Sequence, residues 1–129
     1  MKKEFNTIYE ERYTGRKYYW GKKPSGFALK VLHYLPAGKS TKLIDIGCGE
    51  GRNAVFFARN GYEVTAFDAA ESGIKKTKQL AKEAGVSLDV FSADLTEFRL
   101  KQKYDVIFAH GVLHYLPPEM RVDLLDKFK

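Results

Sequence analysis

Three glycines at alternate positions directly follow a short, mostly apolar run, residues 42–46. They are Gly47, Gly49 and Gly51. Without a Cβ, glycine lets the backbone turn tightly and lets a ligand approach it closely. Glycine-rich turns hold dinucleotides, flavins and other nucleoside ligands, so the turn alone does not identify the ligand class. The sequence therefore predicts a nucleoside-binding loop at residues 47–53.

Acidic residues around this loop favour a cationic ligand over a phosphate-rich one. The spacing is G-x-G-x-G, and Arg52 occupies the position where a dinucleotide fingerprint needs its third glycine. Asp45 would repel a pyrophosphate at a helix N-terminus, but it suits a ligand with an ammonium and a sulfonium. Glu50 adds a second acid inside the loop. We therefore expect an amino-acid-bearing cationic nucleoside, and a nicotinamide-dependent oxidoreductase is the less favoured alternative.

A third acid, Asp68, ends the next apolar run and lies 21 residues after Gly47. An acid at about this distance from the first glycine can accept hydrogen bonds from both ribose hydroxyls. The alternative for Asp68 is a helix cap or a turn residue. Given the glycine loop upstream, we predict the ribose role.

Asp94 and Leu95 follow the third apolar run, residues 87–91. The Asp94 carboxylate could accept from an exocyclic adenine amine while Leu95 packs on the ring. Capping of the short segment 96–98 is the alternative that this position leaves open. We predict the adenine role for this pair.

Candidates for the reaction itself follow the fourth apolar run and lie in the N-terminal region. His110 and His114 are four residues apart, so both could face one side of a helix as a base or as acceptor-positioning groups. Their alternative is capping or packing in a loop. Tyr19 belongs to an aromatic group that forms either a lid or a packing surface; the others are Tyr9, Tyr13, Tyr18 and Trp20. We take His110, His114 and Tyr19 as catalytic candidates and predict no metal, because no third ligand lies near the histidine pair.

The elements that must position these residues alternate between strand and helix. The expected strands are residues 42–46, 63–67, 87–91 and 104–109. The expected helices are residues 5–14, 51–60, 71–84 and 121–129. A further helix starts at Pro24-Ser25-Gly26 and stops at Pro36, and its expected apolar row is Phe27, Val31 and Leu35, at four-residue spacing. This alternation predicts a parallel sheet with right-handed crossovers, whose ligands bind beyond the carboxyl ends of the strands.

Composition indicates one soluble domain of 129 residues, with 44% apolar and 29% charged residues. The single cysteine excludes an intrachain disulfide and fits a reducing compartment. No run approaches the roughly 18 apolar residues of a membrane span, and residues 1–13 lack the apolar core of a signal peptide. We expect a cytoplasmic protein without membrane contact.

The net charge of +6 is unevenly distributed along the chain. Residues 1–42 hold ten Lys/Arg and three Glu, whereas residues 43–129 hold twelve Lys/Arg and thirteen Asp/Glu. A basic stripe with interleaved tyrosines could meet RNA. We favour a solvated N-terminal helix instead and do not expect a nucleic-acid partner.

At these residues the sequence resembles the class I S-adenosylmethionine-dependent methyltransferases. The family's first motif, [DE]-x-G-x-G-x-G, is matched by Asp45 and the three glycines; its acids after strands two and three correspond to Asp68 and Asp94. The fourth motif corresponds to residues 104–110, and the resemblance covers residues 42–116. The implied cofactor is S-adenosyl-L-methionine. The cofactor-binding residues that we predict are Asp45, Gly47, Cys48, Gly49, Gly51, Asn53, Asp68, Ala69, Asp94, Leu95, Ala109 and His110.

A narrower similarity is to the tellurite-resistance-type and related small-molecule methyltransferases. It rests on residues 47–68, on Tyr19-Trp20-Gly21 followed by Pro24-Ser25, and on Leu113-His114-Tyr115-Leu116. It implies methyl transfer to a small-molecule acceptor such as tellurite, selenite, a thiol or a similar anion. Arg52 could steer such an anion, and a solvated or carboxylate-paired arginine is the alternative.

The resemblance implies a sheet of seven strands in the order 3-2-1-4-5-7-6, of which this chain supplies the first four. We therefore expect an α/β fold: a Rossmann-like parallel sheet of order 3-2-1-4 with flanking helices, lacking the C-terminal strands. Residues 1–41 would form a helical and aromatic cap, and residues 42–129 an incomplete S-adenosylmethionine-binding core. Strand four would be an open apolar edge, which favours a homodimer. The alternative function is a non-catalytic S-adenosylmethionine-binding module that acts through oligomerisation.

Overall fold

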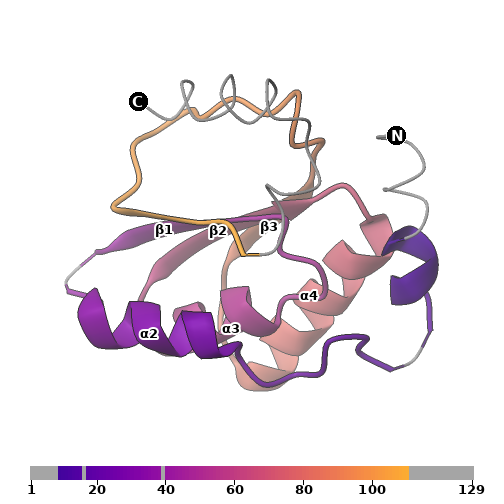
Figure 1. Ribbon diagram of the computed structural model, residues 1–129, viewed down its shortest axis with the longest axis horizontal. Helices are drawn as coiled ribbons and strands as arrows, with labels where there is room; N and C mark the ends of the chain where they lie inside the picture. The colour runs from indigo at the N-terminus through magenta and orange to yellow at the C-terminus, as the bar shows by residue number, and fades with distance from the viewer. Residues whose placement is uncertain (1–8, 16, 39, 111–129) are drawn as a thin grey trace.

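The computed structural model describes residues 9–15, 17–38 and 40–110. Residues 9–13 are helical. The elements that follow are α2 (Gly26–Tyr34), β1 (Lys42–Ile46), α3 (Arg52–Arg59), β2 (Glu63–Asp68), α4 (Glu71–Ala84), β3 (Asp89–Ser92) and β4 (Val106–Phe108) (Figure 1). The helix expected at residues 121–129 and the candidate His114 lie outside the described residues.

The four strands form one parallel sheet in the order β3-β2-β1-β4, which confirms the predicted topology. The register pairs Ile46 with Phe67 and Asp68 with Ser92. Because the strands end at nearly the same level, the loop after β1, the residues after β2 and the residues after β3 lie along one edge. This edge carries most of the residues that the sequence singled out.

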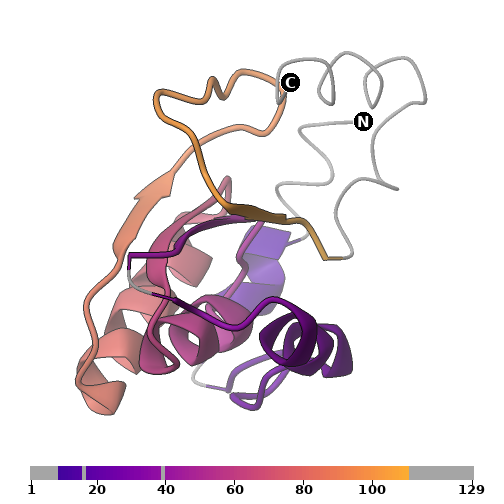
Figure 2. The same cartoon turned by 90° about the vertical axis from the view of Figure 1, so that its left-hand side faces the viewer.

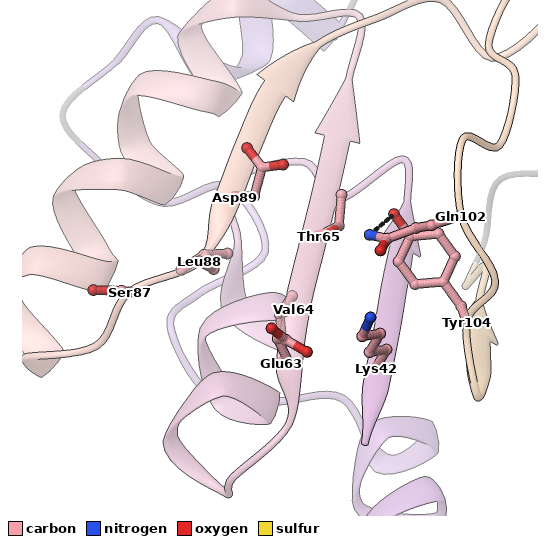
Figure 3. Close-up of a pocket in the computed structure, with 9 residues that line it drawn as sticks. All are labelled: Lys42, Glu63, Val64, Thr65, Ser87, Leu88, Asp89, Gln102 and Tyr104. Atoms are coloured by element: carbon pink, nitrogen blue, oxygen red, sulfur yellow. Dashed lines mark hydrogen bonds between the residues drawn. The ribbon is translucent and has the colours of Figure 1, made fainter. Parts of the chain in front are cut away.

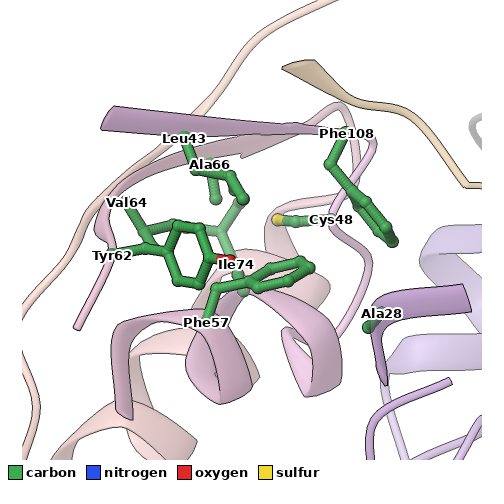
Figure 4. Packing of buried hydrophobic residues seen from close by; sticks show 10 residues of the cluster. Ala28, Leu43, Cys48, Phe57, Tyr62, Val64, Ala66, Ile74 and Phe108 are labelled. Carbon is green, nitrogen blue, oxygen red and sulfur yellow. The ribbon is translucent and has the colours of Figure 1, made fainter. Parts of the chain in front are cut away.

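Helices α2, α3 and α4 all lie on one face of the sheet, as the two views in Figures 1 and 2 show. The side chains of β1 alternate, with Leu43 facing these helices and Ile44 facing away from them. A core of apolar side chains fills the space between the sheet and the helices (Figure 4). Its fully buried members include Leu43, Ala54, Phe57, Ala66 and Phe108.

The segment between β3 and β4 covers the opposite face of the sheet (Figure 2). Phe67 from β2 stacks on Phe98 of this segment, with ring centroids 4.3 Å apart, and also on Phe91 at 5.8 Å. Leu100 and Tyr104 pack on the same cluster. An aromatic cluster therefore shields this face from solvent within the described part of the chain.

Helix α2 forms where the sequence predicts it but buries a different face. Ser25 caps it by accepting the N–H of Ala28 on its hydroxyl oxygen, at 3.2 Å. Ala28 is fully buried, whereas Phe27 and Leu35, two of the three residues in the expected apolar row, are 48% and 54% exposed. The small Ala28 lets the helix approach the core closely, and the larger side chains lie at its margin.

Strand β4 is shorter than the expected run of residues 104–109, and its start is fixed by Asp105. The Asp105 carboxylate accepts the N–H of Lys42 at 2.8 Å, and the Asp105 N–H donates to the Lys42 carbonyl oxygen at 2.8 Å. Among the described strands β4 is at one edge, and Ile107 is 39% exposed. Pairing of this edge in a homodimer stays a prediction. No described helix is long and apolar enough to span a bilayer.

Candidate functional site

The loop that joins β1 to α3 is held against the end of β2. The N–H groups of Gly47 and Cys48 both donate to the carbonyl oxygen of Phe67, each at 2.9 Å. Gly47, Gly49 and Gly51 all have positive φ, at 73°, 58° and 90°. The loop therefore uses glycine for its backbone shape, as the sequence predicts.

The back of this loop packs on α4, and that contact explains Gly51. A Cβ on Gly51 would lie 2.6 Å from Thr77 Cγ2 and 2.9 Å from Thr77 Cα. The fully buried Thr77 hydroxyl can donate a hydrogen bond to the Gly73 carbonyl oxygen, at 2.8 Å, or to the Gly49 carbonyl oxygen, at 3.2 Å. Close approach to helix α4, rather than to a ligand, excludes a side chain at position 51.

Asp68 is joined to the glycine loop by its side chain. One carboxylate oxygen accepts the N–H of Gly49 and the other accepts the N–H of Ala70, both at 2.9 Å. Burial raises the pKa of Asp68, while the N–H groups of Ala70, Gly49 and Ala69 oppose that shift. Each carboxylate oxygen has a second lone pair. Asp68 can therefore accept further hydrogen bonds from a ligand beside the loop.

Asp45 is 3% exposed and shares the helix-side face of β1 with Leu43. Within the described residues no group donates a hydrogen bond to its carboxylate. Burial, and then the neighbouring Asp68 charge, raise the pKa of Asp45 to about 8. Near neutral pH and without a ligand, Asp45 is therefore mostly protonated, which weakens the expected repulsion of a pyrophosphate.

Glu50 has a structural role that the sequence interpretation missed. Its carboxylate lies 2.7 Å from the Lys76 ammonium, in an ion pair whose side chains are 2% and 14% exposed. The other carboxylate oxygen accepts the backbone N–H of Tyr19. Lys76 also donates to the Lys17 carbonyl oxygen at 2.6 Å. The Glu50 charge is therefore compensated, and the proposal that it favours a cationic ligand is wrong.

This ion pair fastens the N-terminal segment beside the glycine loop, where it places Tyr13. Tyr13 is 4% exposed, and a Cβ on Gly49 would lie 3.0 Å from its hydroxyl oxygen. Burial raises the pKa of Tyr13. Sequence reasoning included Tyr13 only in the aromatic group, because nothing in the sequence shows that residues 9–13 dock on Gly49.

The other aromatic residues of that group differ in their surroundings. The Tyr18 hydroxyl donates to the Lys76 carbonyl oxygen at 3.2 Å, which gives Tyr18 a structural contact with α4. Tyr19 and Trp20 are both 49% exposed and meet edge to face, with ring centroids 4.8 Å apart. The catalytic role of Tyr19 stays a prediction.

Asp94 and Leu95 lie at the end of β3, at the same edge of the sheet. One Asp94 oxygen accepts from the Thr96 N–H at 2.8 Å and from the Thr96 hydroxyl at 2.6 Å. This arrangement is the capping that the sequence left open as an alternative. Leu95 packs on the Phe67 cluster. Their adenine-binding role stays a prediction.

His110 follows β4 and lies among residues of the N-terminal half. Its ring stacks on Phe27, with centroids 5.5 Å apart. Partial burial, and then the positive charge of Arg52, lower the pKa of His110. Arg52 is half-buried, its Nη1 lies 3.5 Å from the Trp20 carbonyl oxygen, and within the described residues no carboxylate forms an ion pair with it. The imidazole of His110 and the guanidinium of Arg52 are therefore close enough for the charge of one to affect the pKa of the other.

The remaining predicted cofactor residues contact the protein itself. The Asn53 amide oxygen accepts the N–H of Ser25 at 2.8 Å, which fixes the start of α2. Cys48 is buried in the helix-side core, where Figure 4 shows its sulfur among Leu43, Ala66 and Phe108. Ala69 and Ala109 are half-buried next to Asp68 and His110. Their contacts with a cofactor stay predictions.

A groove of about 560 Å³ lies at the other end of the sheet (Figure 3). It is lined by the first residues of the strands, including Lys42, Glu63 and Asp89, and by Gln102 and Tyr104. In parallel α/β sheets ligands bind at the carboxyl ends, so this groove is not the candidate site. No group of three metal-binding side chains occurs among the described residues.

Comparison with known proteins places this geometry in a family. Residues 7–129 match the family model of tellurite resistance protein TehB. Over 84 residues the chain is 33% identical to the ubiquinone biosynthesis O-methyltransferase of Rickettsia canadensis. The matched region covers 65% of this chain and 35% of that protein. The chain spans about a third of the length of the curated relatives it matches.

Solved structures show the same fold. The TehB crystal structure from Haemophilus influenzae superposes with a TM-score of 0.72 and 22% identity, over 81% of this chain and 35% of that one. An S-adenosylmethionine-dependent methyltransferase from Thiobacillus denitrificans, in complex with S-adenosyl-L-homocysteine, gives 0.72 and 18%, over 94% of this chain and 50% of that one. Because the family model matches nearly the whole chain, the chain belongs to the TehB tellurite resistance family.

Proposed function

We propose that this chain binds S-adenosyl-L-methionine and is part of a methyltransferase that acts on a small anionic acceptor. The observation that carries the proposal is the pairing of Asp68 with the glycine loop. Two backbone N–H groups fix the Asp68 carboxylate at the carboxyl end of β2, beside Gly49, with lone pairs left for a ligand. That is the position at which α/β nucleoside sites hold ribose hydroxyls.

The other donor-side residues fit this cofactor. Asp45 is buried next to Asp68 and has no hydrogen-bond donor among the described residues, so a cationic ligand nearby would favour its ionised form. Gly47 and Gly49 keep the loop free of bulky side chains. When bound, S-adenosyl-L-methionine supplies an activated methyl group on a sulfonium. The chain's own contribution is to hold the donor, orient the acceptor and exclude water.

The surroundings of β4 support an anionic acceptor. Arg52 is half-buried and has no carboxylate partner in the described part of the chain, so it can attract an anion. Partial burial, and then the Arg52 charge, lower the pKa of His110, and its imidazole can orient an acceptor or take a proton. An acceptor that is already an anion, such as a selenium or tellurium oxyanion or a thiolate, needs no base. We place this activity in the cytoplasm, which the single, buried Cys48 thiol supports.

The donor site is tested by calorimetric titration of the chain with S-adenosyl-L-methionine, with NAD as the competing ligand class. We expect binding of the methyl donor, little binding of NAD, and a loss of about tenfold or more in Asp68→Ala. Asp89→Ala, an exposed acid at the amino end of β3, is the matched control and should bind as the wild type does. Equal binding by wild type and Asp68→Ala, or preference for NAD, would overturn the proposal.

The acceptor class is tested by formation of S-adenosylhomocysteine in the presence of selenite, tellurite, a thiol or a neutral amine. We expect turnover with the anions, and a rise in their KM of about tenfold in Arg52→Met. Arg59→Met, at the exposed far end of the same helix, is the control. Turnover of the amine alone, or an unchanged KM in Arg52→Met, would contradict an anionic acceptor.

A further inference from the structure

One carboxylate oxygen of Glu10 is buried and lacks a hydrogen-bond partner. Glu10 belongs to the helical residues 9–13, and its Oε1 accepts the N–H of Ser72, in the first turn of α4, at 3.0 Å. Its Oε2 is shielded from solvent and accepts no hydrogen bond within the described chain. Buried acceptors are nearly always satisfied, because leaving one unpaired is costly. The free oxygen therefore points to a donor that the described residues do not supply.

Glu10 and Asp68 bind neighbouring backbone N–H groups at the start of α4. Burial, and after it the Glu10 charge, raise the pKa of Asp68, in agreement with this placement. Both bind the same turn: Asp68 accepts the N–H of Ala70, and Glu10 accepts that of Ser72. The helix that carries Glu10 also places Tyr13 against Gly49. Glu10 is therefore part of the wall beside the glycine loop.

We propose that Glu10 Oε2 accepts a hydrogen bond from a ribose hydroxyl of the methyl donor, next to the one that Asp68 accepts. This inference rests on the proposed function. A ribose offers two adjacent hydroxyl donors, and two carboxylates that flank one turn match them. The pair would also repel a ribose that carries a phosphate, which makes Glu10 a specificity residue for the unphosphorylated nucleoside.

The test compares S-adenosyl-L-homocysteine with its 2′-deoxy and 3′-deoxy forms as calorimetric probes. Glu10→Ala should weaken binding of the intact probe about tenfold or more. In wild type, the deoxy probe that lacks the bonded hydroxyl should bind more weakly than the intact probe. In Glu10→Ala, these two probes should bind with almost equal affinity. The effects of removing the hydroxyl and of removing the Glu10 carboxylate would then not add, which identifies a direct contact between the two groups.

Two variants separate the contact from a structural effect. Glu11→Ala removes the exposed neighbouring acid and should bind all three probes as wild type does. Glu10→Gln keeps an oxygen for the Ser72 N–H but loses the charge, and its affinity should lie between those of wild type and Glu10→Ala. Thermal unfolding of each variant, measured without ligand, reports any loss of fold.

Two results would overturn the inference alone: wild-type affinity in Glu10→Ala, or the same loss of affinity for all three probes. Both leave the proposed function standing, provided that wild type binds the intact probe and Asp68→Ala does not. Failure of wild type to bind S-adenosyl-L-homocysteine would instead remove the proposed function and this inference together.

Discussion

The candidate site has two halves that are built differently. The donor half consists of the glycine loop, Asp68 and the start of α4, and its side chains are buried and bonded to backbone groups. The proposed acceptor half consists of Tyr19, Trp20, Phe27, Arg52 and His110. Three of these residues are about half exposed, at 49%, 49% and 48%, and they come from segments far apart in the sequence.

This difference follows from what each half has to recognise. A single cofactor needs a fixed shape, and backbone N–H groups and positive-φ glycines provide one that few substitutions preserve. Exposed side chains on a rigid scaffold can change without disturbing the fold. We therefore expect substitutions in the donor half to destabilise the protein far more than those in the acceptor half.

The largest effect is expected for Gly51→Ala. Its Cβ would meet the backbone of Thr77 at 2.9 Å, and the φ of 90° adds strain, so the free energy of unfolding should fall by about 3–4 kcal/mol. Urea denaturation measures this change. Gly85→Ala is the matched control: its φ is 69°, but nothing lies within 4 Å of the added Cβ, and it should cost only about 1 kcal/mol. Equal losses in both variants would show that the contact with α4 is unimportant.

Lys76→Met tests whether the buried ion pair fastens the N-terminal segment. Glu50 would keep a buried charge without a partner, and the Lys17 carbonyl oxygen would lose its donor, so unfolding should cost about 3 kcal/mol less. Affinity for the methyl donor should fall as well, because Tyr13 and Glu10 lose their anchor. Urea denaturation and calorimetry measure the two effects.

The control for this prediction is Lys75→Met, the exposed lysine next to it on α4. It should change the free energy of unfolding by less than about 0.5 kcal/mol. If Lys76→Met matched it in stability and in donor affinity, the Glu50–Lys76 pair would be an incidental contact.

Asp45→Asn should change how stability depends on pH. Because the pKa of Asp45 is about 8 in the folded chain and near 3.8 when unfolded, folding retains a proton between those values. The free energy of unfolding of the ligand-free wild type should therefore fall as pH rises from about 4 to about 8. The variant should escape Asp45's share of that fall, which amounts to a few kcal/mol. Denaturation at pH 5 and pH 8.5 measures it.

Asp68 has its pKa raised too and remains in the variant, so the difference between the two proteins isolates Asp45. The exposed Asp89 provides the control, and Asp89→Asn should follow the wild-type curve. Parallel curves for wild type and Asp45→Asn would mean that Asp45 is ionised in the folded protein at neutral pH.

The contrast between the halves also explains what the sequence could predict. The alternation of strands and helices, the glycine loop and the placement of Asp68 depend on short-range patterns: apolar runs, glycine spacing and a fixed distance along one βαβ unit. The strand order was implied by the family resemblance. Strands β1, β2 and β3 pair in their sequence order, whereas β4 pairs with β1. The fold was therefore accessible from the sequence.

Long-range contacts of single side chains were not accessible in this way. Glu50 reads as a loop acid, but Lys76, 26 residues later, neutralises it. Tyr13 reads as one aromatic residue among several, and its contact with Gly49 depends on where residues 9–13 dock. The face that α2 buries depends on Ala28, because close approach to the core favours the smallest side chain. Periodicity alone ranks the larger Phe27 and Leu35 first.

The smallest effect belongs to the acceptor half and concerns protonation rather than stability. Arg52→Met removes the positive charge that contributes, after burial, to lowering the pKa of His110. The pKa of His110 should therefore move back up toward its ordinary value of 6.5, without reaching it. The NMR shift of the His110 ring protons against pH measures this. Arg59→Met should leave the titration unchanged, and the free energy of unfolding should change by less than about 0.5 kcal/mol in both variants. An unchanged titration in Arg52→Met would show that the two side chains do not interact, and their proximity would then no longer support an anionic acceptor.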